Sequence, residues 1–153
     1  MSVKPLIGVA GLGTMGLGIA QLFAQAGHPV VATDAVAQAH ATALERIAAS
    51  LAPRVSAGKL SPETRDTTLA NISVAESVAG LRDAALVIEA VVEDLAIKQA
   101  LLRDVEHHVS GDAVIATNTS SLPVARIMSG LKHPRRGLGL HFFNPAPVMM
   151  LVE

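Results

Sequence analysis

The sequence predicts an α/β fold: a doubly wound, mostly parallel sheet with helices on both faces. Short apolar runs alternate with longer segments of helical spacing, and a glycine-rich turn follows the first run. Half of the 153 residues are hydrophobic, yet only 2% are aromatic, so aliphatic side chains must build the core. This composition suits helices packed on a buried parallel sheet. Residues 1–153 suffice for one domain with its own core.

Seven short apolar runs have the length and composition of buried strands. The fourth run contains Glu89, which leaves the position of its end open. The seventh follows a turn rich in proline. The runs span residues 6–10, 30–32, 72–74, 86–92, 113–117, 138–142 and 148–152.

Helical spacing connects these runs. Residues 14–26 carry one apolar stripe, and the helix that this stripe predicts ends at Gly27. An alanine-rich helix over residues 36–52 is expected to be interrupted by Pro53. Ser61 then provides an N-cap, followed by a first-turn proline and an early acid, and opens a helix towards Ala70. Two further helices are expected over residues 96–109 and 123–128.

The turn after the first strand matches the dinucleotide fingerprint G-x-G-x-x-G, in the sequence Gly11-Leu12-Gly13-Thr14-Met15-Gly16. Gly11 allows the tight turn, Gly13 lets the backbone approach a pyrophosphate, and Gly16 brings the helix close to the strand. The diphosphate would then lie on free N–H groups at the helix N-terminus. The alternative interpretation is an ordinary tight turn.

Asp34 ends the second strand, where a carboxylate can accept hydrogen bonds from both adenosine ribose hydroxyls. A helix N-cap is the competing interpretation of this residue. Ala35 follows instead of an arginine, and Asp34 would repel a 2′-phosphate. Strand, glycines, helix and acid together predict a Rossmann-type domain that binds NAD rather than NADP.

An acid–base pair is predicted from His141 and Glu153, which eleven residues separate. A strand end, a proline turn and a second strand between them can bring imidazole and carboxylate together. A histidine beside a carboxylate moves protons near neutral pH. Asn144 and the turn containing Ser120 should converge at the same edge of the sheet, where such folds bind ligands. A histidine satisfied at a strand end and a solvated glutamate are the alternatives.

Four motifs in this order resemble the NAD-binding domain of the 3-hydroxyacyl-CoA dehydrogenases, and the resemblance covers the whole chain. The motifs are Gly-Leu-Gly-Thr-Met-Gly-Leu-Gly-Ile-Ala at 11–20, Glu-Ala-Val-Val-Glu at 89–93, Asn-Thr-Ser-Ser-Leu at 118–122 and His-Phe-Phe-Asn-Pro-Ala-Pro-Val-Met-Met-Leu-Val-Glu at 141–153.

The resemblance implies NAD-dependent interconversion of 3-hydroxyacyl-CoA and 3-oxoacyl-CoA. His141 is similar to the family's catalytic base, and Glu153 to the carboxylate that stabilises its imidazolium. Several polar positions are also implied to serve the site: Ser120 and Asn144 beside the nicotinamide and substrate oxygen, Glu93 and Lys98 on the cofactor side, and Asp34 at the ribose. Lys59 lies where the family contacts CoA, although a solvated charge is an equal alternative.

Charge and composition narrow the remaining classes. A net charge of −1 gives no electrostatic case for nucleic acid or membrane binding. Without cysteine, disulfides and thiolate chemistry are excluded, and no metal site is predicted. No apolar run reaches the length of a membrane span, and no signal peptide or transit segment is recognised, so a cytoplasmic protein is expected. The basic turn at residues 132–136 is interpreted as a solvated loop rather than a phosphate site.

Family members continue into a helical domain that closes the substrate cleft and commonly forms a homodimer interface. This chain is therefore expected to be an N-terminal fragment that binds NAD but turns over little substrate alone. Two alternative functions stay open. The first is another β-hydroxyacid dehydrogenase, because the Gly-Leu-Gly-Thr-Met-Gly motif is also typical of 3-hydroxyisobutyrate and 6-phosphogluconate dehydrogenases, which use a catalytic lysine. The second is a non-catalytic nucleotide-binding relative, and the intact His141 argues against it.

Overall fold

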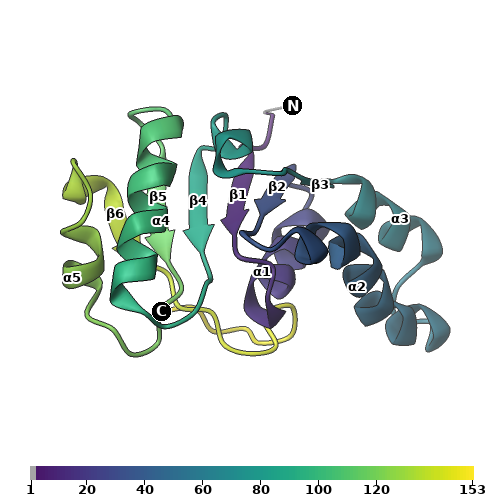
Figure 1. Ribbon diagram of the computed structural model, residues 1–153. Helices are drawn as coiled ribbons and strands as arrows, with labels where there is room; N and C mark the ends of the chain where they lie inside the picture. The colour runs from purple at the N-terminus through teal and green to yellow at the C-terminus, as the bar shows by residue number, and fades with distance from the viewer. Residues whose placement is uncertain (1–2) are drawn as a thin grey trace.

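The computed structural model describes residues 3–153 and forms a six-stranded, entirely parallel sheet in the order β3-β2-β1-β4-β5-β6 (Figure 1). Met1 and Ser2, with which the segment inspected for a signal peptide begins, lie outside the described residues. The predicted α/β fold is confirmed. The strands are β1 Ile7–Ala10, β2 Val30–Thr33, β3 Ile72–Val74, β4 Leu86–Glu89, β5 Val114–Thr117 and β6 Gly137–Gly139.

Helices cover both faces of the sheet, as expected for a doubly wound fold. The helices α1, α2 and α3 contribute to one buried apolar layer, and α4, α5 and η1 to the other. Their bounds are α1 Thr14–Gln25, α2 Ala37–Ser56, α3 Pro62–Ala70, α4 Leu95–His108 and α5 Val124–Met128, with short 3₁₀ turns η1 Val78–Leu81 and η2 Pro134–Arg136.

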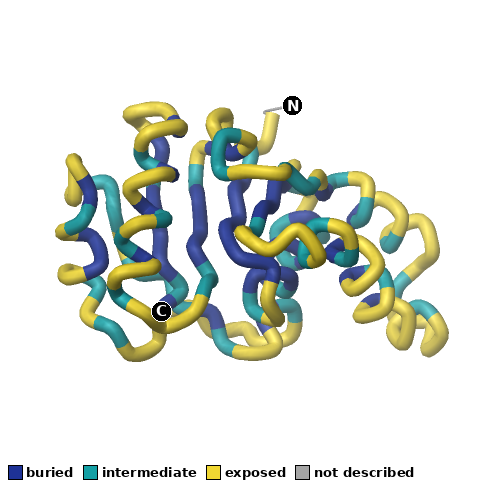
Figure 2. The backbone as a smooth tube through the Cα atoms, viewed as in Figure 1, coloured by how far each residue is buried: buried dark blue, intermediate teal, exposed yellow. Residues whose placement is uncertain are grey.

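Alternate residues of each central strand supply the two layers. Val9 and Ile88 join the layer beneath α1, whereas Ala10 and Val87 join the layer beneath α4. Successive side chains of a strand point to opposite faces, so a sheet covered on both sides needs continuous apolar strands. The four central strands, β2, β1, β4 and β5, are accordingly buried, while the outer helix surfaces are exposed (Figure 2).

Two strands end earlier than predicted, and the seventh is absent from residues 3–153. The fourth strand stops at Glu89 rather than at residue 92, because the chain turns there. The sixth covers Gly137–Gly139 rather than residues 138–142. Residues 148–152 do not form a strand; a single antiparallel bridge joins Phe142 to Val152. The N–H groups of Val148 and Met149 donate to the carbonyl of Pro145, at 3.0 Å each, so the beginning of this run is a turn.

Pro53 does not interrupt its helix, contrary to the prediction. It lies in the last turn of α2, where the missing N–H costs a single hydrogen bond and the helix continues to Ser56. Gly58, with a φ of +68°, follows the helix end. The predicted N-cap at Ser61 is confirmed, since its Oγ accepts a hydrogen bond from the Thr64 N–H at 3.1 Å. The sequence did not predict η1 and η2.

The topology places a crevice between β1 and β4. The chain leaves β1 towards β2 on one side and leaves β4 towards β5 on the other, so the connections diverge at this point. All strands end at one edge of the sheet. The C-terminal segment, yellow in Figure 1, crosses that edge.

Replacing Ser61 by alanine should lower the free energy of unfolding by about 1 kcal/mol, because the N–H group of Thr64 loses its acceptor. Chemical denaturation would measure the change. Ser77→Ala is the matched control, since Ser77 caps η1 without a side-chain hydrogen bond. Equal effects of the two changes would contradict the capping role.

Candidate functional site

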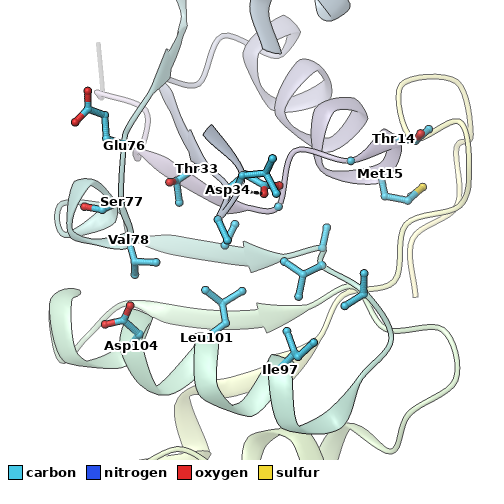
Figure 3. A pocket seen from close by; sticks show the side chains of 18 residues that line it. Thr14, Met15, Thr33, Asp34, Glu76, Ser77, Val78, Ile97, Leu101 and Asp104 are labelled. Carbon is cyan, nitrogen blue, oxygen red and sulfur yellow. Dashed lines mark hydrogen bonds between the residues drawn. The ribbon is translucent and has the colours of Figure 1, made fainter. Parts of the chain in front are cut away.

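A cleft of about 870 Å³ opens at the crevice between β1 and β4 (Figure 3). Its walls come from the glycine turn, the end of β2, the segment after β3, the turn after β4 and one side of α4. The lining residues are Ala10, Gly11, Gly13, Thr14, Met15, Thr33, Asp34, Ala35, Val36, Glu76, Ser77, Val78, Ala90, Val91, Val92, Ile97, Leu101 and Asp104.

Each fingerprint glycine meets a separate steric demand. Gly11 has a φ of +110°, and a Cβ there would lie 2.6 Å from the carbonyl oxygen of Ala90. A Cβ on Gly16 would overlap the carbonyl oxygen of Gly11, so only glycine lets α1 start this close to β1. Gly13 differs, because no protein atom lies within 4 Å of its Cβ position. It is the N-cap of α1 without a side-chain cap, so the first amides remain available to an anion.

Asp34 links the end of β2 to the glycine turn. Its Oδ2 accepts the N–H of Leu12 at 2.7 Å, and its Oδ1 accepts the N–H of Val36 at 2.9 Å. The N-cap interpretation of Asp34 is wrong, because Val36 is the N-cap of α2. Each carboxylate oxygen can accept a further hydrogen bond, and the side chain lies at the centre of the cleft in Figure 3.

Sequence reasoning missed two other features, one in this cleft and one beside it. Val78, Ile97 and Leu101 form an apolar wall opposite Asp34 (Figure 3). Ile97 is 50% exposed and borders the cleft rather than the core. In addition, Nη1 of Arg46 donates to the carbonyl of Leu12 at 2.9 Å. No local motif marks this long-range contact.

A second cavity of about 350 Å³ shares a wall with the first, formed by Met15 and the turn after β4. Six of the predicted site residues line it, namely Met15, Glu93, Lys98, Ser120, His141 and Asn144. Its lining consists of Met15, Ala90, Val91, Val92, Glu93, Lys98, Asn118, Ser120, His141, Phe142, Phe143 and Asn144. Glu153 does not line this cavity but lies at a neighbouring, more open hollow of about 390 Å³, which His141 and Ser120 also line.

His141 and Glu153 lie side by side although the chain between them forms a loop. Their backbones exchange two hydrogen bonds, of 2.8 Å and 3.0 Å. Nδ1 of His141 lies 3.3 Å from Oε2 of Glu153. The histidine side chain is 25% exposed and the glutamate 65%. Two backbone hydrogen bonds therefore hold the acid beside the imidazole at the rim of the cavity.

Two contacts hold the segment that carries His141 and Asn144. Asn118 Oδ1 accepts the N–H of Phe142 at 2.8 Å, which ties the residue after His141 to the end of β5. Gly18 of α1 lets the loop approach, since a Cβ there would lie 3.3 Å from that of Ala146. Only the Asn-Thr-Ser-Ser motif hinted at a role for Asn118.

A buried ion pair lies behind the second cavity. Nζ of Lys98 is 2.6 Å from Oε1 of Glu89, and neither side chain is more than 1% exposed. Nζ also contacts Oε1 of Glu93 at 3.1 Å and the carbonyl of Val91 at 3.2 Å. These three acceptors use all three donors of the ammonium group. Lys98 therefore lies at the predicted cofactor-side position, but its ammonium group has no free donor for a ligand.

Glu93 is held at the cavity by hydroxyl groups from the turn after β5. Its Oε2 accepts from Thr119 at 2.6 Å and from Ser121 at 3.0 Å. Partial burial acts to raise the pKa of Glu93, but the hydrogen bonds from Thr119, Lys98 and Ser121 outweigh it and lower the pKa below its ordinary value. Glu93 is consequently ionised at neutral pH.

The weaker basic candidates lie elsewhere. Lys59 is exposed in the turn after α2 and lines neither of the two cavities. In the basic turn, Arg136 donates to the carbonyls of Ala113 and Ser110. The N–H groups of Lys132 and His133 donate to the carboxylate of Glu106. These bonds give the basic turn a structural role.

Comparison with known proteins gives consistent matches over this chain. Residues 6–153 match the family described as "3-hydroxyacyl-CoA dehydrogenase, NAD binding domain". A 3-hydroxybutyryl-CoA dehydrogenase of Mycobacterium tuberculosis is 43% identical over 148 residues, which cover 96% of this chain and 52% of that protein. A 3-hydroxyadipyl-CoA dehydrogenase of Escherichia coli K12 is 44% identical over 147 residues, 96% of this chain and 31% of that protein.

Solved structures give the same picture. The crystal structure of (S)-3-hydroxybutyryl-CoA dehydrogenase from Ralstonia eutropha matches with a TM-score of 0.93 and 35% identity, and the match covers 99% of this chain and 53% of that one. The chain thus spans about half the length, or less, of these relatives.

Substituting Gly16 by alanine should destabilise the protein by about 3 kcal/mol or more, at the upper end of overpacking costs, because the new methyl group overlaps the Gly11 carbonyl. Thermal and denaturant unfolding would quantify the loss. Gly111→Ala is the control, as nothing lies within 4 Å of its Cβ position. A Gly16→Ala protein as stable as this control would refute the close approach.

Proposed function

The chain belongs to the 3-hydroxyacyl-CoA dehydrogenase family, and from that premise we propose that it supplies the NAD site and the acid–base pair for reversible oxidation of (S)-3-hydroxyacyl-CoA to 3-oxoacyl-CoA. One observation carries the proposal. His141, which Glu153 contacts at 3.3 Å, lines a cavity that shares a wall with the dinucleotide cleft.

The residues of the larger cleft fit NAD. The open space at Gly13 and the uncapped start of α1 suit a diphosphate, and Asp34 suits the adenosine ribose. The apolar wall at Val78 and Leu101 suits the adenine ring. Asp34 would repel the 2′-phosphate of NADP. When bound, NAD supplies the acceptor for the hydride.

His141 serves as the base in this proposal. Nδ1 is directed to Glu153, which leaves Nε2 to accept the proton of the substrate 3-hydroxyl group. The Glu153 carboxylate then stabilises the imidazolium. Ser120 and Asn144 line the same cavity and supply short donors to the oxygen that becomes a carbonyl. In the reverse direction His141 returns its proton to that oxygen.

Several properties of the whole protein belong to the same proposal. Because the chain accounts for 52% of the Mycobacterium relative, we propose that a helical domain completes the substrate cleft and forms a homodimer. The relatives named for 3-hydroxybutyryl-CoA and 3-hydroxyadipyl-CoA support a CoA thioester substrate.

No helix within residues 3–153 has the length and apolar character needed to cross a membrane. The proposed compartment is the cytoplasm, in keeping with a chain that contains no cysteine.

Changing His141 to alanine in the full-length protein should reduce kcat with acetoacetyl-CoA and NADH by about 10²- to 10⁴-fold, because the general acid–base group is lost. The dissociation constant of NADH should change little, since the imidazole is assigned to the substrate. Steady-state kinetics and NADH fluorescence titration would measure both. His107→Ala, on the exposed side of α4, is the control.

The same experiment separates the rivals. A lysine-dependent β-hydroxyacid dehydrogenase would keep its kcat after the His141 change. A non-catalytic relative would show no turnover even before it. Either result would refute the proposed acid–base role.

Changing Gly13 to alanine should leave stability unaltered, because no protein atom lies within 4 Å of the added methyl group. NADH affinity should nevertheless fall by about tenfold or more, because the methyl group keeps the diphosphate away from the backbone N–H groups. Losing a single charge-assisted hydrogen bond costs about 1.5–3 kcal/mol. Calorimetric titration and thermal melting would test the separation. Unchanged affinity would place the diphosphate elsewhere.

A further inference from the structure

Glu89, Lys98 and Glu93 form a charged cluster where β4 turns into α4. The proposed function gives Glu89 no role, and Glu89 lines neither the dinucleotide cleft nor the second cavity. Nevertheless, a carboxylate that is 0% exposed at the end of a central strand requires an explanation, because an ionised group is costly to bury.

Glu89 and Lys98 neutralise each other within the protein. The ammonium lies 2.6 Å from Oε1 of Glu89, and the same oxygen accepts the N–H of Val91 at 2.7 Å. The second oxygen accepts the hydroxyl of Thr117 at 2.6 Å. Every oxygen of Glu89 thus has a strong donor, which is the condition under which a buried ion pair persists.

Glu93 is the member of the cluster that reaches the cavity. Its side chain is 40% exposed, and its contact with Lys98, at 3.1 Å, is longer than that of Glu89. The hydrogen bonds from Thr119 and Ser121 hold its carboxylate in one orientation. Two carboxylates share a single ammonium, so the cluster has one net negative charge, and Glu93 presents it to the cavity of His141 and Asn144.

We propose that this cluster favours the oxidised cofactor, whose nicotinamide ring is cationic, over the reduced cofactor, whose ring is neutral. Glu89 is a positioning residue in this arrangement: it engages Lys98, so that the charge of Glu93 is not cancelled. The inference rests on the proposed function, because it requires the nicotinamide end of NAD to reach the second cavity.

The ratio of the NAD⁺ and NADH dissociation constants is a readout that a merely structural role would not change. Their nicotinamide rings differ by one positive charge, whereas their hydrogen-bonding groups are nearly the same. A residue that only contacts or orders the cofactor changes both dissociation constants together. A fixed negative charge changes their ratio.

The test measures dissociation constants of NAD⁺ and NADH for the full-length protein by calorimetric titration. Glu93→Gln keeps the shape and an acceptor oxygen but removes the charge. It should weaken NAD⁺ relative to NADH by about two- to tenfold, the size of a screened interaction between single charges. Added salt should reduce the difference between the two proteins.

The control is Asp83→Asn, an exposed carboxylate between η1 and β4 at the amino-terminal edge of the sheet. It removes the same net charge away from the cleft and should leave the ratio unchanged. A ratio that shifts equally in this control, or that stays constant in Glu93→Gln, would overturn the inference.

Glu89→Gln provides the second arm. Lys98 is then neutralised by Glu93 alone, so the ratio should shift in the same direction although Glu89 does not line either cavity. Circular dichroism establishes whether this variant folds; if it does not, Glu93→Gln decides. Folded Glu89→Gln protein with an unaltered ratio would contradict the role of Glu89. If the unchanged protein bound neither cofactor form, the proposed function would be wrong as well. If it bound both forms but the variants left the ratio of the dissociation constants unaltered, only this inference would be wrong.

Discussion

The buried ion pair between Glu89 and Lys98 is the interaction on which the arrangement of this site depends. Glu89 ends β4 and Lys98 lies in the first turns of α4, so the pair joins the strand to the helix that follows it. A buried ammonium requires a carboxylate, because the desolvation of an unpaired charge is costly. Through Val91 and Glu93 the same ammonium fixes the turn that forms the common wall of both cavities.

The glycine turn is held by comparable long-range bonds. The N–H of Leu12 is bound by Asp34 and its carbonyl by Arg46, so the peptide groups on both sides of this residue are oriented from outside the loop. A loop ordered in advance loses less conformational entropy when it binds a ligand. The catalytic candidates are held in the same way, since Asn118 and Glu153 fix the backbone around His141.

Much of the fold and part of the site could be predicted, because their signals are local. Apolar runs, the fingerprint glycines and the cap at Ser61 each specify a backbone conformation within a few residues. The errors have a physical reason as well. Pro53 is tolerated because it lies in the last helical turn. The expected seventh strand fails because the N–H groups of Val148 and Met149 bind the Pro145 carbonyl in a turn, which leaves a single bridge at Val152. The apolar wall at Ile97 was missed because periodicity cannot distinguish a core face from a cleft.

The sequence by itself determined the order of strands and helices, the glycine turn and the chemical types of the site residues. Only the tertiary structure decided which charges meet. Glu89, Lys98 and Glu93 come from a strand, a helix and a turn, and Thr119 reaches them from the next strand's end. Contact between such groups depends on how parallel strands align at one edge, and no pattern within a short segment records that alignment.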